Sequence, residues 1–136
     1  MSNNMDILRK LMGGSQFKDR TSDEFKRAMA EVFASDIEVH EPECLPYGGV
    51  HRGRENWLNI RETMMSLWEQ KLDVLHMWDL PEDDVIIMNY MMEWTARSTG
   101  RAFRQPAIEV LTFKNGQIVK VEFYPQDAKA MVDTLT

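Results

Sequence analysis

At Lys71 the spacing of apolar residues changes from a helical period to an alternation that continues to about Tyr124. Alternation is typical of half-buried strands, because successive side chains of a strand point to opposite faces. Turn sequences such as Pro81-Glu82-Asp83-Asp84 and Lys114-Asn115-Gly116 interrupt it. The pattern therefore predicts a meander of four antiparallel strands, at about residues 71–80, 85–97, 102–113 and 118–124.

The residues before Lys71 predict helices and one short strand. Apolar residues at helical spacing indicate a short piece at 6–12, a helix ending at Ala34 and a helix from near Arg54 to near Gln70. An extended segment lies between the two helices at 37–41, and a last helical segment is expected at 126–135. Helices and strands do not alternate as in βαβ units, so the predicted fold class is α+β, a sheet wrapped on N-terminal helices.

The alternation also predicts which side chains share a face. Those expected on one face of the first long strand are Leu72, Val74, His76 and Trp78, and those on the buried face of the second are Ile86, Met88, Tyr90, Met92 and Trp94. Apolar residues such as Ile108 and Val110 occupy part of the opposite face. Because the helices cover only one face, we expect a second copy of the chain to cover the other in a homodimer.

Length and composition limit the kinds of protein that this chain can be. With 136 residues and 43% hydrophobic content, we expect one domain over residues 1–136, with 1–14 as a loosely packed segment. The net charge of -6 repels phosphate backbones, which argues against a nucleic-acid partner. No stretch approaches the roughly 18–20 apolar residues of a membrane span, and Cys44 has no second cysteine to pair with. We expect a soluble cytoplasmic protein with no membrane partner.

The segment 40–55 holds more reactive side chains than any other stretch. It contains two histidines, three carboxylates, a tyrosine and the only cysteine, together with two prolines and three glycines. This composition argues against a long helix or strand and predicts a loop held between rigid elements, where functional sites are usually built.

Three groups of residues carry a family signal. They are Phe33-Ala34-Ser35-Asp36 leading into Val39-His40-Glu41-Pro42, the segment Gly49 to Glu55, and residues 108–113 followed by Asn115-Gly116-Gln117-Ile118. Together they resemble the nuclear transport factor 2-like superfamily, in its SnoaL-like and ketosteroid-isomerase-like branch, over roughly Ser15 to the end of the chain. The resemblance implies a cone-shaped curved sheet, mixed or antiparallel, around a hydrophobic pocket. The superfamily hosts isomerases, cyclases, dehydratases, epoxide hydrolases and noncatalytic binders, so the fold alone does not decide function.

The resemblance implies roles for individual residues. In ketosteroid isomerases the acid before the proline of the first motif is the general base, and Glu41 holds that place here. An acid in the penultimate strand helps to bind the enolate oxygen, and Glu109 falls near that position. The tyrosine of the oxyanion hole corresponds to Phe17, which has no hydrogen-bond donor. The candidates to replace it are Tyr47, Tyr90 and His51.

Two carboxyl groups in one apolar cavity have raised and unequal pKa values, as in ketosteroid isomerase, so one can serve as acid and the other as base at neutral pH. Each candidate also has a structural interpretation. Glu41 would then be a solvated carboxylate at a strand end, and Glu109 the partner of a buried arginine or tyrosine. His40, which has the opposite parity to Glu41, and His51 are also consistent with surface positions. Asp127 either acts at the cavity mouth or caps the last helix.

These observations predict an enzyme that uses general acid-base chemistry without a cofactor, an isomerase or a lyase such as a dehydratase, on a small apolar molecule, aromatic or polycyclic. One alternative is a noncatalytic ligand-binding or dimerisation module, and another is a polyketide-cyclase-like or epoxide-hydrolase-like enzyme. No metal site is expected, because the histidines and acids match no recognised ligand spacing. The predicted catalytic residues are Glu41, Glu109, Tyr47 and His51. The predicted substrate-binding residues are Phe17, His40, Trp68, Met88, Tyr90, Met92, Trp94, Leu111 and Phe123.

Overall fold

The computed structural model describes residues 3–12 and 23–136, which form helices and strands in the order that the change of period predicts. The first elements are α1 (Asn3–Met12), α2 (Asp23–Val32), β1 (Phe33–Glu41), β2 (Gly49–Arg52) and α3 (Arg54–Leu67). They are followed by β3 (Trp68–Leu80), β4 (Val85–Ala96), β5 (Ala102–Lys114), β6 (Gln117–Pro125) and α4 (Ala128–Asp133). The α+β class is confirmed. None of the described helices combines the length and the apolar character needed to cross a membrane.

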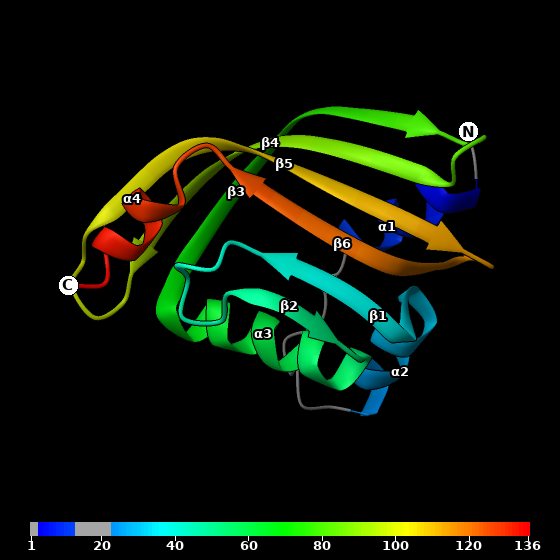
Figure 1. The fold of residues 1–136 in the computed structure, drawn as a ribbon, viewed down its shortest axis with the longest axis horizontal. Helices are drawn as coiled ribbons and strands as arrows, with labels where there is room; N and C mark the ends of the chain where they lie inside the picture. Colours follow the sequence, from blue (N-terminus) through cyan, green and yellow to red (C-terminus); the bar gives the residue numbers. More distant parts are fainter. Residues whose placement is uncertain (1–2, 13–22) are drawn as a thin grey trace.

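All six strands of the described chain join in one curved sheet, in the order β2-β1-β6-β5-β4-β3. β3 to β6 form the predicted antiparallel meander, and β1 pairs with β6 in parallel. Figure 1 shows α3 on the concave side of this sheet, with α1 and α2 at one end of the molecule and α4 at the other. The concave side is therefore enclosed by helices, as an α+β fold requires to bury one face of its sheet.

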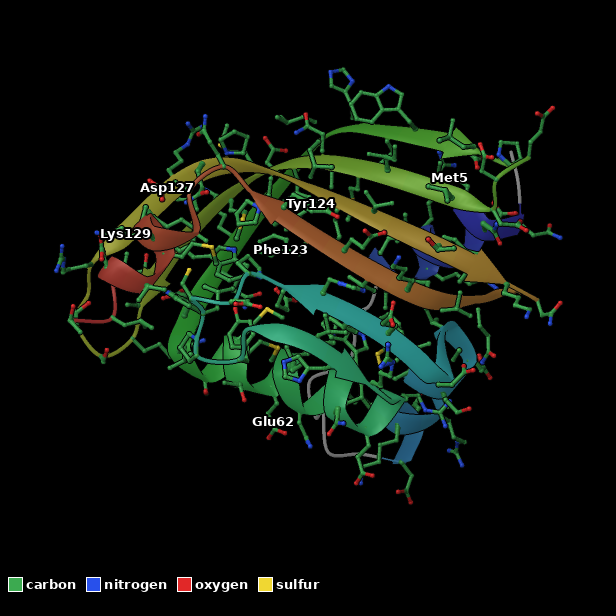
Figure 2. The ribbon with its side chains drawn as sticks, viewed as in Figure 1. Met5, Glu62, Phe123, Tyr124, Asp127 and Lys129 are labelled. Atoms are coloured by element: carbon green, nitrogen blue, oxygen red, sulfur yellow. The ribbon has the colours of Figure 1, made fainter. Side chains whose placement is uncertain are left out.

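The core lies on the concave face. The even-numbered residues of β4 from Ile86 to Ala96 are buried, as the alternation predicts. The same face continues onto β5, where Glu109 pairs with Met88, and onto β6, where Phe123 pairs with Glu109. Figure 2 shows Phe123 on the inner side of β6 and its neighbour Tyr124 on the outer side. One row across the sheet thus mixes a carboxylate with large apolar side chains.

A β-bulge in β3 contradicts one prediction. The pairing of β3 with β4 skips Leu75, so the alternation of side chains changes parity at this residue. Leu72 and Val74 lie on the same side as the buried face of β4, whereas His76 and Trp78 lie on the outer face. The expectation that these four residues share a face was wrong. The alternation of apolar residues in a sequence does not indicate where a bulge leaves one residue of the strand unpaired.

Several element boundaries also differ from the predictions. Phe33, expected near the end of a helix, begins β1, and Trp68, expected in the second amphipathic helix, begins β3 by pairing with Ala96. Four residues of the predicted loop form β2, which pairs with the second half of β1. A strand of that length is too short to give a recognisable alternation. Asp127 caps α4, because its Oδ1 accepts the N–H of Ala130 at 3.1 Å.

Candidate functional site

The loop after β1 folds back on the end of that strand. The N–H of Leu45 donates to the carbonyl of Pro42 at 3.1 Å, and the N–H of Gly48 donates to the carbonyl of Leu45 at 2.9 Å. A Cβ on Gly48 would lie 2.3 Å from the Pro42 oxygen, so this approach requires glycine. Leu45 and Tyr47 are buried. The loop therefore places two side chains in the interior instead of only displaying polar groups.

A cavity of about 250 Å³ lies between the concave face of the sheet and the helices α1 and α3, and Glu41 and Glu109 both line it. Phe123 pairs with Glu109 in β5. On its other side, His40 of β1 pairs in parallel with Glu122, so the next residue, Glu41, lies beside Phe123. Neighbouring strands are about 4.8 Å apart, so the two acids extend from positions about 10 Å apart on the same face. Residues distant in sequence thus bring two carboxyl groups into one enclosed space.

Glu41 is buried, and its Oε2 has no hydrogen-bond partner among the described residues. Burial and, to a smaller extent, the negative charge of Glu109 raise the pKa of Glu41 to about 8. At neutral pH the carboxyl group of Glu41 therefore keeps its proton, yet it can lose that proton within the physiological range.

Glu109 is half-buried and has a hydrogen-bond donor. The hydroxyl of Tyr90 donates to its Oε2 at 2.8 Å. Burial raises the pKa of Glu109, while this hydrogen bond and the positive charge of Arg61 oppose the rise. Burial, followed by the charge of Glu109, raises the pKa of the Tyr90 hydroxyl, which stays a donor. Because the negative charge of Glu109 contributes to the raised pKa of Glu41, the two acids titrate as a coupled pair.

Arg61 brings a positive charge to the cavity wall from α3. Its guanidinium carbon lies 5.5 Å from the ring centroid of Trp57 and 5.6 Å from that of Phe33, which are cation–π distances. The two rings meet edge to face at 5.8 Å. This cluster fixes α3 against the start of β1 and holds the indole of Trp57 in the lining of the cavity.

The structure brings together most of the residues predicted to bind substrate. Of the predicted site residues, those that line the cavity are Glu41, Glu109, Met88, Tyr90, Trp94, Leu111 and Phe123. Met92 and Trp68 are fully buried beside it, and the Nε1–H of Trp68 donates to the hydroxyl of Thr134 at 2.9 Å. Tyr47 packs edge-on against Trp68 at 6.4 Å, and burial and then the charge of Glu41 raise the pKa of its hydroxyl. Phe17 lies outside the described residues.

Both histidines of the segment 40–55 lie away from the cavity lining. His40 faces the outer side of β1, where its Nε2 is 2.9 Å from Oε2 of Glu38, and Arg52 donates to the other oxygen of that carboxylate at 2.6 Å. These two hydrogen bonds, that of His40 first, lower the pKa of Glu38. His51 donates from Nε2 to the carbonyls of Tyr47 at 2.9 Å and Gly48 at 3.0 Å. His51 therefore braces the loop, and neither ring is placed to contact a ligand in the cavity.

Sequence reasoning missed the contribution of α3 and α1 to the cavity. The lining residues that it did not single out as functional include Leu8, Leu11, Trp57, Arg61 and Met64. The spacing of Trp57, Arg61 and Met64 follows one face of a helix. This spacing was the available signal, but an apolar helix face is usually interpreted as core.

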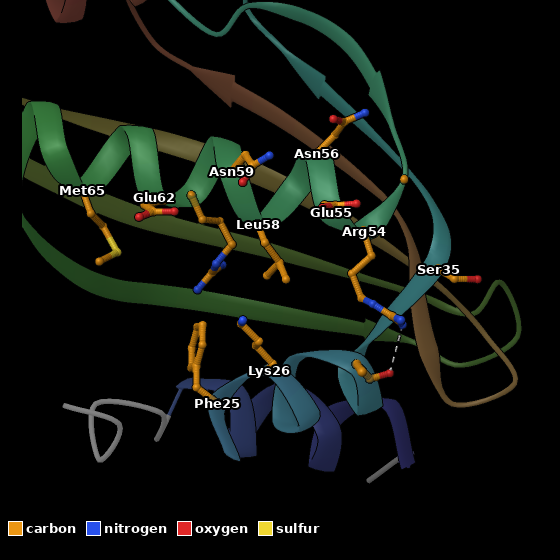
Figure 3. A pocket seen from close by; sticks show the side chains of 13 residues that line it. Phe25, Lys26, Ser35, Arg54, Glu55, Asn56, Leu58, Asn59, Glu62 and Met65 are labelled. Atoms are coloured by element: carbon orange, nitrogen blue, oxygen red, sulfur yellow. Dashed lines mark hydrogen bonds between the residues drawn. The ribbon is translucent and has the colours of Figure 1, made fainter. Parts of the chain in front are cut away.

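A larger hollow, of about 990 Å³, lies between α2 and α3 (Figure 3). Its side chains include Arg54, which donates to the backbone oxygens of Phe33 at 3.1 Å and Ala30 at 3.5 Å. The acids that line it, Glu55 and Glu62, are exposed. Within residues 3–12 and 23–136, no three His, Cys, Asp or Glu side chains lie close enough together to hold a metal ion. The cavity that holds the two enclosed acids is therefore the candidate site.

Comparisons with known proteins agree with the architecture. A family model described as a SnoaL-like domain matches residues 19–121. A crystal structure of an NTF2-like protein of unknown function from Burkholderia pseudomallei K96243 is similar at 21% identity and a TM-score of 0.80, covering 100% of this chain and 99% of that one. No curated protein matches the chain.

Two other solved structures are similar in fold. One, from Jannaschia sp. CCS1, is described as a putative SnoaL-like polyketide cyclase. It is 11% identical in sequence, the match covers 98% of this chain and 91% of that one, and the TM-score is 0.75. The other is TerC co-crystallized with polyporic acid. It is 14% identical in sequence, the match covers 98% of each chain, and the TM-score is 0.77. Identities this low establish the fold alone, whereas the family model spans most of the chain. The chain therefore belongs to the SnoaL-like domain family, and its fold is similar to that of NTF2-like proteins.

Proposed function

We propose that the protein is a general acid-base enzyme, an isomerase or lyase, in which Glu41 exchanges a proton with a carbon atom of a small cyclic ketone. The observation that carries this proposal is the pair of acids in one cavity, with Glu41 buried, its Oε2 without a hydrogen-bond partner among the described residues and its pKa raised to about 8. A base is most effective when its pKa lies near the working pH, and a carboxyl group attains this only through desolvation or a neighbouring charge.

In the proposed reaction, ionised Glu41 removes a proton from the carbon beside a carbonyl group. The electrons of the C–H bond form the C=C bond of an enolate, and the negative charge moves to the carbonyl oxygen. Protonated Glu41 then returns the proton to a conjugated carbon, which completes an isomerisation. Alternatively, a leaving group departs from the neighbouring carbon with its bonding electrons, which completes an elimination.

We assign Glu109 a different role from the one that the family resemblance implies. Burial raises the pKa of Glu109, while the hydrogen bond from Tyr90 and the charge of Arg61 oppose the rise. In this proposal Glu109 is the acid of the pair that ionises first, because its charge raises the pKa of Glu41. An ionised carboxylate accepts hydrogen bonds and cannot donate one to an enolate oxygen. Its negative charge instead helps to raise the pKa of Glu41. Glu109 is therefore a positioning and tuning residue in this proposal.

The size of the cavity supports a smaller substrate than a polycyclic one. Its volume of about 250 Å³ lies below the range of about 300–1,000 Å³ typical of pockets for drug-sized ligands. An engineered cavity of about 150 Å³ is known to hold benzene. One ring or two fused rings is thus the size class that fits. The aromatic and methionine side chains of the wall suit a largely apolar ring system.

The experiment that tests the proposal follows the exchange of α-hydrogens of α-tetralone, a two-ring ketone, in heavy water by proton NMR. We expect the wild-type protein to accelerate exchange over buffer, with a rate that rises with pH up to about pH 8 and then levels off, because the base must be ionised. Glu41→Gln should reduce exchange to the buffer rate. Glu109→Gln should move the rise to lower pH, since it removes a charge that raises the pKa of Glu41.

The matched control is Glu93→Gln, which removes an exposed carboxylate from β4 and should leave exchange unchanged. The proposal is wrong if the wild-type protein does not accelerate exchange between about pH 6 and pH 9, or if Glu41→Gln retains the acceleration. Binding of α-tetralone without any exchange would instead support a noncatalytic ligand-binding module.

We also propose that two copies pair through the outer sheet face. Trp78 pairs with Ile87 and Ile87 with Val110, which makes a row of apolar side chains, and Trp78 and Tyr124 are 46% and 52% exposed. Light scattering during size exclusion should give twice the monomer mass, and Val110→Lys should give the monomer. A monomeric wild-type protein would remove this proposal.

We also propose that the chain forms a single domain and that the protein works in a reducing compartment. One cluster of buried residues runs from Met5 in α1 to Met131 in α4, which supports a single cooperative unfolding transition. Cys44, the only cysteine of the chain, is an exposed free thiol, which favours the cytoplasm. A second transition in urea would contradict the single domain.

A further inference from the structure

The residues that line the cavity of Glu41 and Glu109 differ in their exposure to solvent. Most of them are buried, and four are half-buried. Gln70 and Leu72 are the lining residues that the described structure leaves exposed, and the side chain of Leu72 is 47% exposed. A residue that lines a cavity and is also exposed marks the place where the cavity meets solvent. The cavity therefore opens at the start of β3.

Both side chains lie on the concave side of the sheet. Gln70 pairs with Trp94 and Leu72 pairs with Met92, and both partners belong to the buried face of β4. Side chains that pair across two antiparallel strands lie on the same face. An exposed leucine is ordinary on a protein surface, but of the large apolar side chains that are exposed in the described chain, Leu72 alone lines the cavity.

The arrangement of the elements explains why the cavity opens here. β3 lies at the edge of the sheet, so no described strand continues the concave wall beyond it. α3 ends at Leu67 and β3 begins at the next residue, so the last turn of the helix adjoins the first residues of the strand. Met64 in this last turn and Leu11 near the end of α1 are half-buried lining residues. The opening thus lies where the edge of the sheet approaches α3 and α1.

We infer that Gln70 and Leu72 form the entrance of the cavity, and that the size of the Leu72 side chain determines which ligands pass. Gln70, Leu72, Met64 and Leu11 are all uncharged. An ion would lose water at such an entrance without gaining an opposite charge, so the entrance favours uncharged, largely apolar compounds. The inference goes beyond the proposed function, because it concerns access to the cavity and does not depend on the chemistry inside.

The test attaches a bulky group at position 72 after a ligand has bound. Leu72→Cys is made together with Cys44→Ser, because Cys44 is an exposed free thiol. The variant is saturated with 1-fluoronaphthalene, a two-ring compound of the size class that fits the cavity, and is then labelled with benzyl methanethiosulfonate. Fluorine NMR after dilution measures the release of the ligand. We expect the label to slow release at least about tenfold, because a group in the entrance raises the barrier to exit, and reduction of the label should restore the original rate.

The matched control is Leu75→Cys, also made together with Cys44→Ser. Leu75 lies in the same strand and is 45% exposed, close to the value for Leu72, but it does not line the cavity. Labelling at position 75 should leave the release rate unchanged. As a second measurement without any label, Leu72→Ala should speed the release of 1-fluoronaphthalene, and Leu75→Ala should not.

The inference is overturned if the wild-type protein does not bind 1-fluoronaphthalene, or if the two labelled variants release it equally fast. It is also overturned if labelling at position 72 expels the ligand, because that side chain would then fill the cavity instead of its entrance. 1-Fluoronaphthalene has no carbonyl group and no α-hydrogen, so the result is independent of the proposed function. Slow release without exchange of α-tetralone in the wild-type protein would refute the acid-base function and retain the entrance, and exchange with equal release rates would do the reverse.

Discussion

Replacing Glu41 by glutamine should make the protein more stable, by an amount that grows with pH. The folded state binds the Glu41 proton more tightly than the unfolded state, because the pKa is about 8 in the fold and 4.5 in the reference state. As the pH rises through this interval the unfolded chain ionises first and is stabilised, so the folded state loses stability relative to it. Glutamine has the same shape as the neutral acid and never ionises.

The magnitude follows from the shift in pKa, at about 1.4 kcal/mol per pH unit between the two values. Glu41→Gln should exceed the wild type in unfolding free energy by less than about 1 kcal/mol at pH 5, by about 3 kcal/mol at pH 7, and by about 5 kcal/mol above pH 8, where the difference levels off. Because Glu41 is 7% exposed, solvent screens little of this cost.

Urea unfolding of both proteins, followed by circular dichroism at unit steps of pH, measures the difference. Glu93→Gln is the control for the loss of an exposed negative charge. A difference that stays constant from about pH 5 to pH 8, or a Glu41→Gln variant that is less stable than wild type at about pH 8, would refute the reasoning from burial. A functional residue is expected to lower stability where its function requires that a group which can become charged is buried away from water.

Two further changes test the structure around the site. Tyr90→Phe removes the donor to Glu109, so it should raise the pKa of Glu109, visible in a carbon NMR titration of the carboxyl groups, and lower the unfolding free energy by about 1–3 kcal/mol; an unchanged titration would contradict the hydrogen bond. Gly48→Ala should cost at least about 1–3 kcal/mol in thermal or urea unfolding, because its Cβ would lie 2.3 Å from the Pro42 oxygen. Gly100→Ala, at a positive φ with open space around it, is the matched comparison and should cost less, so equal losses would count against the close approach.

The strands of the meander could be predicted because a strand with one buried face has apolar residues at every second position of its sequence. The even-numbered side chains of β4 lie where that pattern places them, and Glu41 lies opposite in parity to His40. The pattern failed at Leu75, since one bulged residue reverses the faces of the rest of β3. It also failed at Trp68, where a helix passes directly into a strand and no breaking residue marks the change.

The site was predictable in part, and for a different reason. Glu41 and Glu109 are polar residues on otherwise apolar faces, which is a signal that sequence alone contains. Trp57 and Arg61 gave no such signal, because an aromatic residue on a helix face is indistinguishable from core until the opposite wall is known. The roles of His40 and His51 could not be inferred from residue type, since hydrogen bonds to Glu38 and to loop carbonyls decide where the rings point.

The place of β6 in the sheet has a consequence for how the protein folds. β6 follows the other described strands in the sequence, yet it lies between β1 and β5, so it is the one described strand that pairs with both the strand of Glu41 and the strand of Glu109. The acids can acquire their mutual influence only after β6 has been synthesised and has inserted between β1 and β5. Such long-range parallel pairing is intrinsically slow. We therefore expect the proton-binding property of the interior to appear late in folding, as a product of the finished sheet.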